Sequence, residues 1–445
     1  MKLIIFAFIA LLTLTNCAEK NRTFSTSEIA ILPKPISLDL HKASFAFKAD
    51  QTIFSNLDEQ QIAAQDLQNY INKTASFNLN IDKNNNSSIV FEKKEGLNAQ
   101  SYELSVTPKK ITIYANDVAG YFYGVQTVKQ LMAIETSKDT RHTKYLVPSV
   151  TIKDGPRFKW RAFMLDEARY FHGEVFVKQM LDQMALLKMN TFHWHLIDDA
   201  GWRIEIKKYP LLTKVGAFRA DSEIGTWKSG KTSGQPHGGF YTQEQIKDIV
   251  AYAKARNINI VPEFEMPGHS SAAIAAYTWL GTAGIAIDVP VKFGRLYDNY
   301  DVTKPEVITF MKDVLTEIFE LFPSEVIHIG GDEVGYEVWE KSSSVQKYMK
   351  ENNIPTPADL QINFTNKISH YIEENGRRMM GWNEILGKNI HTDFAEKQAD
   401  KEAETVLSKN VIVHFWKGDL GLLTDAAKKG YGIVNSLHSS TYLDY

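Results

Sequence analysis

Residues 326–333 read Val-Ile-His-Ile-Gly-Gly-Asp-Glu, an apolar run followed by two glycines and two adjacent carboxylates. The apolar run predicts a β-strand, and Gly330 and Gly331 at its end leave room for a ligand to approach the backbone. The carboxylates of Asp332 and Glu333 then indicate general acid/base chemistry of the kind that cleaves a glycosidic bond. An isolated Asp-Glu pair is more often a solvated turn, so this interpretation depends on the rest of the chain.

The sequence around this stretch alternates strand-like and helical patterns. Strand-like runs occur at residues 161–165, 191–197, 258–264, 326–329, 378–382, 411–416 and 432–437, and helical patterns such as 175–188, 243–255, 306–321 and 360–374 lie between them. This alternation predicts an α/β fold, namely a (β/α)8 TIM-type barrel over residues 156–445 with its catalytic groups at the carboxyl ends of the strands. A doubly wound open sheet is the alternative, but no glycine-rich phosphate loop follows the first strand.

The barrel region contains seven strand candidates before the sequence stops at Tyr445. A closed barrel of this type has eight strands. We therefore expect a barrel that lacks its last strand and is incomplete at its C-terminus, as in a truncated or split-gene product. Such a barrel would leave its first strand without one neighbour.

The region before the barrel, residues 31–155, mixes both kinds of pattern and predicts a small α+β domain. Helical patterns fall at residues 58–70 and 119–132, and a β-hairpin is expected at residues 102–114. Nothing in this region has the pattern of a catalytic site, so we expect it to serve as a scaffold.

The N-terminal residues 1–17 have the pattern of a secretion signal, with Lys2, an apolar run at residues 3–12 and then Cys17. The apolar run is too short to span a membrane. The segment resembles a bacterial lipoprotein signal, in which such a cysteine is lipidated, although Asn16 is atypical there; an ordinary signal peptide is the alternative. Residues 18–30 are expected to form a flexible tether. We expect export to the periplasm, outer membrane or cell surface of a bacterium, with membrane attachment only through the lipid.

The composition of the chain argues against nucleic acid as a partner and against internal disulfides. The chain has 445 residues, 44% of them hydrophobic, and a net charge of −3, with its basic residues spread along the sequence. Because no basic stripe could bind a phosphate backbone, nucleic acid is not an expected partner. Cys17 is the only cysteine, so the mature chain can form no internal disulfide and must be stabilised by burial.

Polar and aromatic side chains accompany the predicted barrel strands. They are Arg161 at the first strand, His193, His195, Asp198 and Asp199 at the second, Glu263, Glu265 and His269 at the third, Trp382, Asn383 and Glu384 at the fifth, Trp416 at the sixth, and Tyr442 and Asp444 after the seventh. In a barrel these groups would converge at the end where the carboxyl ends of the strands lie, which we call the mouth. Aromatic rings there would stack on the apolar faces of a sugar, and Arg and Asp would hydrogen-bond its hydroxyls.

Six sequence motifs resemble the family-twenty glycoside hydrolases, the β-N-acetylhexosaminidases. The first is His-Ile-Gly-Gly-Asp-Glu at residues 328–333. The others are Arg-Ala-Phe-Met-Leu-Asp at 161–166, Phe-His-Trp-His-Leu-Ile-Asp-Asp at 192–199 with Gly-Trp-Arg at 201–203, Pro-Glu at 262–263 with Met-Pro-Gly-His at 266–269, Thr-Tyr-Leu-Asp at 441–444, and Gly-Tyr-Phe-Tyr-Gly-Val-Gln-Thr at 120–127. The last resembles the small domain that precedes the family's barrel.

The resemblance implies a role for each residue that matches a family motif. Glu333 would protonate the glycosidic oxygen and later activate water, while Asp332 would hold the N–H of the substrate's 2-acetamido group, whose oxygen attacks C1. The expected substrate-binding residues are Arg161, Trp382, Trp416, Tyr442 and Asp444, and Asp198 and His269 would orient the acid. The implied activity is the removal of terminal amino sugars from an oligosaccharide or glycoconjugate, with retention of configuration and without a metal or other cofactor.

Two other functions fit parts of the sequence. A metal-dependent barrel hydrolase could use His193, His195 and His269 with Asp332, because an H-x-H pair at a strand end is a common beginning of such sites. A surface lipoprotein that binds amino sugars without cleaving them is the second alternative. For His328 we expect a buried structural histidine, and for Trp194 and Trp202 packing or rim positions. The sequence leaves open the choice between GlcNAc and GalNAc, the natural glycan and the oligomeric state.

Overall fold

The computed structural model describes residues 22–75, 77–83, 86–136, 143–226, 229–292, 294, 298–387 and 403–443. The chain divides into two compact units, with the division between Arg157 and Phe158. Within the described residues, no helix is both long and apolar enough to cross a membrane.

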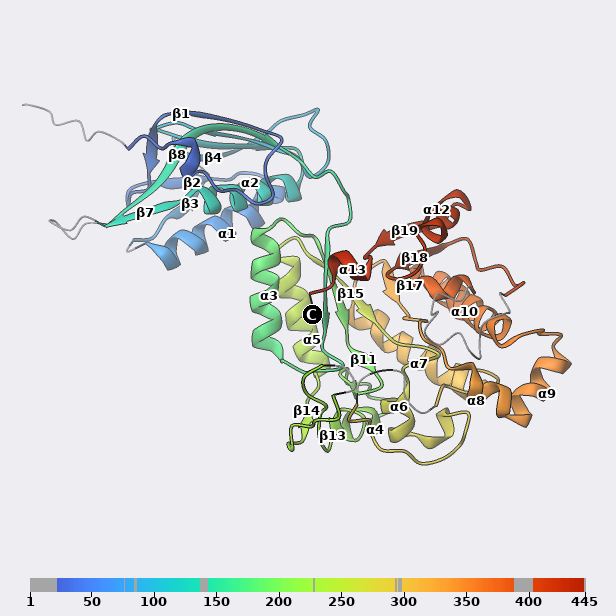
Figure 1. Ribbon diagram of the computed structural model, residues 1–445. Coiled ribbons are helices and arrows are strands. Elements are labelled where there is room, and N and C mark those ends of the chain that lie inside the picture. The colour runs from blue at the N-terminus through green and yellow to red at the C-terminus, as the bar shows by residue number, and fades with distance from the viewer. Residues whose placement is uncertain are drawn as a thin grey trace, which may run out of the picture. The chain divides into compact units, whose positions relative to one another are not determined.

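The first unit is an α+β domain built on a mixed sheet. Its strands are β1 (Ser37–Ala46), β2 (Thr52–Phe54), β3 (Asn80–Asp82), β4 (Ile89–Lys93), β5 (Tyr102–Val106), β6 (Ile111–Ala115), β7 (Ala133–Thr136) and β8 (Thr143–Asp154). They follow the order β1-β8-β5-β6-β4-β2-β3, and β7 pairs with β8. The helices α1 (Asp58–Thr74) and α2 (Val118–Leu131) pack side by side on one face of this sheet (Figure 1).

The second unit is built on seven parallel strands. They are β9 (Ala162–Asp166), β10 (Thr191–His195), β15 (Asn259–Glu263), β16 (Val326–His328), β17 (Arg378–Trp382), β18 (Val411–Phe415) and β19 (Gly432–Asn435). Their order is β19-β18-β17-β16-β15-β10-β9, so each strand lies beside its predecessor in this series and β9 and β19 form the two edges. Two short antiparallel pairs are also present, β11 (Ile197–Asp198) with β12 (Gly201–Trp202) and β13 (Phe218–Arg219) with β14 (His237–Gly238).

Helices connect these strands and cover the outside of the sheet (Figure 1). The longer ones are α3 (Glu174–Leu186), α5 (Gln243–Lys254), α7 (Pro305–Leu321), α9 (Ser343–Glu351), α10 (Pro357–Glu374) and α12 (Leu420–Lys428). The shorter ones are α4 (Leu211–Lys214), α6 (Ser271–Ala276), α8 (Tyr336–Lys341) and α13 (His438–Thr441), with 3-10 turns η1 (Thr26–Glu28), η2 (Thr278–Leu280) and η3 (Asn383–Leu386). Thr242 and Gln245 form a capping box at the start of α5.

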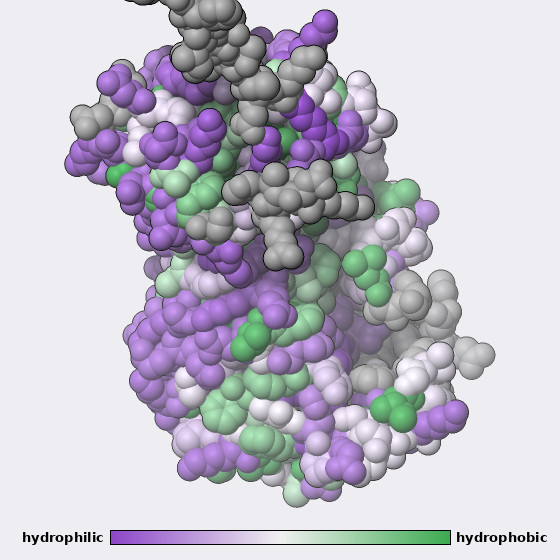
Figure 2. All heavy atoms as spheres, turned by 90° about the vertical axis from the view of Figure 1, so that its left-hand side faces the viewer, coloured by the Kyte–Doolittle hydropathy of each residue, from purple (hydrophilic) through white to green (hydrophobic). Residues whose placement is uncertain are grey.

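The predicted fold class is confirmed, because the seven expected strands form one curved parallel sheet of the barrel type. Strand β10, which has a neighbour on both sides, is buried along its whole length, whereas β9 at the edge is half-buried. Trp194 and Trp202 are completely buried and pack against other aromatic rings, so both have packing roles rather than rim positions. Outside, hydrophilic side chains dominate the face shown in Figure 2, and hydrophobic ones occur there in small separate groups.

Candidate active site

The two adjacent carboxylates lie just beyond the carboxyl end of β16. The backbone there is left-handed at Gly330 (φ +65°), Gly331 (φ +92°) and Glu333 (φ +46°). A Cβ atom at Gly330 would lie 1.7 Å from Oε2 of Glu265, so only glycine fits between β16 and that carboxyl group. The turn leaves the side chains of Asp332 and Glu333 partly accessible, with 15% and 20% of each exposed.

His269, which follows β15, faces both carboxylates. Its Nε2 atom is 3.6 Å from Oδ2 of Asp332 and 3.6 Å from Oε2 of Glu333. On the other side of the ring, Nδ1 is 3.0 Å from Oδ2 of Asp199 and 3.4 Å from Oδ1 of Asp198. Burial alone would lower the pKa of His269, but the surrounding carboxylates outweigh it and raise that pKa well above its ordinary value. The ring is therefore a cation held between two pairs of carboxylates.

Asp198 is itself neutralised by neighbouring cations. Its Oδ2 is 2.7 Å from Nη2 of Arg169 and 3.2 Å from Nε2 of His195. Burial would raise the pKa of Asp198, but Arg169, His269 and His195 together hold it well below its usual range. These neighbours therefore hold Asp198 in its ionised form.

Arg169 was not among the residues expected from the sequence, although it lies at the mouth. Its guanidinium bridges Asp166, at 3.0 Å from Nη1, and Asp198, and 29% of the side chain is exposed. Residues 166–169 directly follow the strand predicted at 161–165. The rule that active-site groups follow barrel strands would therefore have found Arg169.

The expectation for Arg161 is wrong. This residue immediately precedes β9, so it lies at the amino end of the strand, opposite the mouth. Its Nε atom donates to the carbonyl of Lys188 and its Nη1 atom to the carbonyl of Phe158, both at 2.8 Å. Arg161 therefore links the segment before β9 to the segment after α3, at the amino end of the sheet.

Three predicted aromatic residues come together at the other side of the mouth. The rings of Trp382 and Trp416, at the ends of β17 and β18, have centroids 6.5 Å apart, and Tyr442 stacks on Trp416 with centroids 6.4 Å apart. Nε1 of Trp416 donates to both carboxylate oxygens of Glu384, at 3.1 and 3.0 Å. The remaining predicted positions, Asp444 and Cys17, lie outside the described residues.

Comparisons with known proteins agree with this geometry. The family model for the catalytic domain of glycosyl hydrolase family 20 matches residues 158–445, and the model for domain 2 of the same family matches residues 28–155. The chain belongs to glycosyl hydrolase family 20. The resemblance of the sequence motifs is thereby confirmed.

Relatives of known name support the assignment. The beta-hexosaminidases of Porphyromonas gingivalis and Vibrio furnissii are each 34% identical, over 98% and 94% of this chain and over 54% and 64% of their own lengths. The crystal structure of the GH20 exo beta-N-acetylglucosaminidase of Vibrio harveyi in complex with N-acetylglucosamine matches with a TM-score of 0.79 and 31% identity, covering 94% of this chain and 62% of that one. The chain thus spans between half and two thirds of the length of these relatives.

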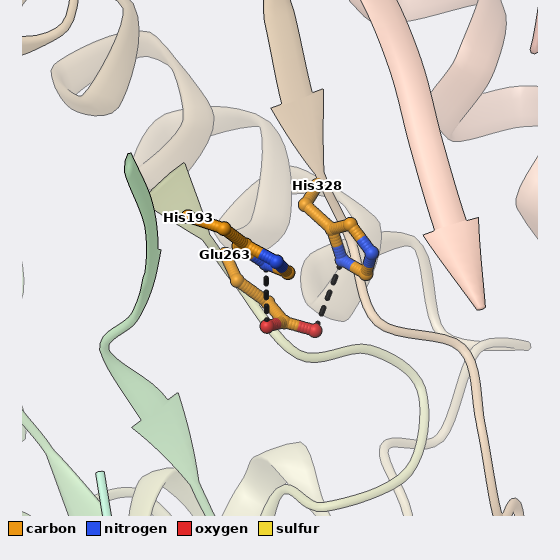
Figure 3. Close-up of side chains that lie close together, drawn as sticks. All are labelled: His193, Glu263 and His328. Atoms are coloured by element: carbon orange, nitrogen blue, oxygen red, sulfur yellow. Dashed lines mark ion pairs between the residues drawn. The ribbon is translucent and has the colours of Figure 1, made fainter. Parts of the chain in front are cut away.

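The ligand set of the metal-dependent alternative does not come together in this family 20 chain. Three groups of described residues have ligand atoms close enough to share an ion: His193, Glu263 and His328; His195, Glu263 and Glu265; and Asp198, Asp199 and His269. None of them contains Asp332, and none joins His269 to either of the other two proposed histidines. In the first group, both histidines lie against the carboxylate of Glu263 (Figure 3), and all three residues are buried. His328 is fully buried in it, in agreement with the structural role expected for this histidine.

We predict that the second unit loses stability as the pH rises from neutral. Burial would lower the pKa of His195, but Glu263, Asp166 and Asp198 raise it to about 10, whereas an unfolded histidine titrates near pH ~6.5. The stabilisation is therefore complete below about pH 6.5 and is lost as the pH rises towards 10. His269 contributes in the same direction.

Urea unfolding between pH 7 and 9 measures this loss. All eight tryptophans lie after residue 157, so their fluorescence reports on the second unit alone. His195→Gln should flatten the dependence of unfolding free energy on pH, and His370→Gln, at an exposed position of α10, is the control. Equal slopes in the wild type and His195→Gln would contradict the assignment.

Proposed function

We propose that this protein is an exo-acting β-N-acetylhexosaminidase. It would remove terminal, non-reducing β-linked N-acetylglucosamine or N-acetylgalactosamine from glycans or chitooligosaccharides and retain the configuration at C1. One observation carries the proposal: Oδ1 of Asp332 is buried, and the described residues offer it no hydrogen-bond partner. A buried carboxylate oxygen without a donor is costly unless a ligand provides one, and the N–H of a 2-acetamido group is such a donor.

The first chemical step would use both adjacent carboxylates. Asp332 accepts the acetamido N–H and turns the carbonyl oxygen towards C1. As that oxygen forms a bond to C1, the bond from C1 to the leaving oxygen breaks, and Glu333 gives its proton to the leaving oxygen. The product on the sugar is an oxazolinium ion, and no protein nucleophile is needed. Asp332 and Glu333 both face the single Nε2 atom of His269, so one buried cation lies beside both carboxyl groups.

The second step would return the enzyme to its starting state. Glu333, now ionised, takes a proton from a water molecule while the oxygen of that water bonds to C1 and the ring of the oxazolinium ion opens. Two inversions at C1 give overall retention. Trp382, Trp416 and Tyr442 are grouped so that they could enclose the acetamido group, with the Tyr442 hydroxyl donating to its oxygen. Arg169 replaces Arg161 as the residue we assign to the ring hydroxyls, and Asp444 is expected to assist it.

Release of p-nitrophenol from its N-acetyl-β-glucosaminide and N-acetyl-β-galactosaminide tests the function and compares the two sugars. Turnover of either supports the proposal. Binding of N-acetylglucosamine without turnover would instead favour the non-catalytic sugar-binding protein.

Glu333→Gln should abolish nearly all hydrolysis of chitobiose, since proton donation typically contributes ~10²–10⁴-fold to the rate. The loss should be smaller for the p-nitrophenyl substrate, whose leaving group needs little protonation. Steady-state kinetics on the two substrates measure the difference. Equal losses would remove Glu333 from the acid role.

Asp332→Asn should impair the step in which the acetamido oxygen attacks C1, so turnover should fall strongly even with the activated p-nitrophenyl substrate. The wild type should be nearly inactive on p-nitrophenyl β-glucoside, which lacks the acetamido group. Comparable rates on the glucoside and the N-acetylglucosaminide would refute participation by the substrate.

Arg169→Met and Arg161→Met should have different effects. Loss of Arg169 removes hydrogen bonds to the sugar and leaves the buried Asp198 without a cation, so kcat/KM should fall by about 10²-fold or more. Loss of Arg161 should lower the midpoint of thermal unfolding with little change in KM. A rise in KM for Arg161→Met alone would restore the original assignment.

We also propose that the protein is exported and anchored through a lipid on Cys17. The signal-like pattern of residues 1–17, which ends at Cys17, supports this proposal. Expressed in a bacterium fed with labelled palmitate, the wild type should incorporate label and sediment with membranes. Cys17→Ala should do neither, and labelled Cys17→Ala would refute the proposal.

A further inference from the structure

A continuous layer of side chains crosses the inside of the sheet beneath the mouth. Six neighbouring strands contribute one residue each. We call this set the inner layer: His193 from β10, Glu263 from β15, His328 from β16, Trp382 from β17, His414 from β18 and Ser436 just after β19. The first five are buried.

Glu263 is the centre of the inner layer. Its Oε1 atom accepts a hydrogen bond from Nε1 of Trp382 at 2.8 Å and lies 2.9 Å from Nδ1 of His328. Its Oε2 atom lies 2.9 Å from Nε2 of His193 and 2.9 Å from Nδ1 of His195, although neither pair has the direction of a hydrogen bond. Figure 3 shows His193 and His328 on either side of this carboxylate. The indole of Trp382 is thus the best-aligned donor to Glu263.

Glu263 binds the edge of the Trp382 ring, and His414 packs against a face of the same ring. The two rings stack with centroids 4.2 Å apart and an angle of 23° between their planes. His414 is held in turn, because its Nδ1 is 3.2 Å from Nε2 of His328 and its Nε2 is 2.7 Å from Oγ of Ser436. The hydrogen bond to Glu263 and the stacked ring of His414 therefore both hold the Trp382 ring, and His328 packs against it edge-on with centroids 4.8 Å apart.

The charge of Glu263 strengthens the bond to Trp382. Burial would raise the pKa of Glu263, but His195, His328 and His193 outweigh it and hold the pKa well below its usual range. A hydrogen bond to an ionised acceptor is roughly twice as strong as one between neutral groups. A buried carboxylate also binds its donors firmly because losing one leaves charge uncompensated.

We propose that Glu263 is a positioning residue for the sugar pocket: its carboxylate holds the Trp382 indole by the Nε1–H bond and so sets the wall against which the acetamido group lies. This inference rests on the proposed function only in assigning Trp382 to the acetamido group. The ring of Trp416 lies at 67° to that of Trp382, so the bond between Glu263 and Trp382 would also affect the position of Trp416.

The hydrogen bond can be observed directly by nuclear magnetic resonance on protein labelled with 15N-tryptophan. Trp382→Phe identifies the Trp382 indole signal among those of the eight tryptophans. In the wild type this N–H should resonate downfield and exchange slowly with deuterium. In Glu263→Gln it should move upfield and exchange at least about tenfold faster, because a neutral amide oxygen is a weaker acceptor than a carboxylate.

Glu167→Gln is the matched control. Glu167 is an equally buried carboxylate that accepts from the Tyr241 hydroxyl at 2.6 Å and lies 2.8 Å from Nδ1 of His172, with no contact to Trp382 among the described residues. This variant should be destabilised without any shift of the Trp382 signal. If Glu263→Gln fails to fold, the rate at which the Trp382 indole N–H of the wild type exchanges with deuterium still tests whether this hydrogen bond exists.

A double-mutant cycle tests whether Glu263 acts through Trp382. Each of Glu263→Gln and Trp382→Phe should lower kcat/KM by about 10- to 100-fold, the range expected when a pocket group is displaced. The double variant should be no worse than the poorer single variant, because residues in contact are not additive. Glu167→Gln combined with Trp382→Phe should show independent, multiplying losses.

Three results would overturn the proposal. They are a Trp382 N–H that exchanges in the wild type as fast as an exposed indole, an unchanged Trp382 signal in Glu263→Gln, and multiplying losses in the Glu263/Trp382 double variant. Stoichiometric metal in the purified wild type that is lost in Glu263→Gln would also overturn it, because Glu263 would then be a ligand. If the wild type turns over no N-acetylhexosaminide, the proposed function fails while the resonance measurements still decide the role of Glu263.

Discussion

A carboxylate that is withdrawn from water is stable only when nearby groups neutralise it, and two such carboxylates lie beneath the mouth of this sheet. Glu263 is surrounded by imidazoles and the Trp382 indole, and Asp198 by Arg169 and His269. His195 joins the two, with Nδ1 2.9 Å from Glu263 and Nε2 3.2 Å from Asp198. The proton on His195 therefore balances both carboxylates at once, and the positions of the groups above them depend on it.

This arrangement gives each side of the pocket its own support. On one side, Asp198 fixes Arg169 and, with Asp199, the ring of His269, which faces the two proposed catalytic carboxylates. On the other side, Glu263 fixes Trp382, and Trp382 meets Trp416. The acidic stretch itself is placed by backbone conformation, since only glycine at position 330 can pass so close to Glu265. Side-chain charge and backbone shape together bring groups from separate parts of the chain to one mouth.

The sequence indicated most of the residues that form the site, but it did not indicate which of them contact one another. The rule that active-site groups follow barrel strands led to Asp332, Glu333, His269, Trp382 and Trp416, which the structure gathers at the mouth. Arg161 was grouped with them, but it precedes its strand and therefore lies at the opposite end. Arg169, three residues beyond the end of β9, satisfies the rule and contacts Asp198. The error was one of strand direction, and the sequence contained the information needed to avoid it.

Alternating apolar patterns determine where strands and helices form, because they need only the local period of each element. The sequence by itself therefore determined the α/β class, the seven strands, the small preceding domain and the acidic strand end. The partners of Glu263 could not be read in this way. Glu263 meets His328 and Trp382 because β15, β16 and β17 are neighbours in a particular register and curve about a common interior. Pairing between strands far apart in sequence depends on how the whole chain packs. Only the tertiary structure therefore decided that Glu263 holds Trp382 on one side of the pocket and that Asp198 holds Arg169 and His269 on the other.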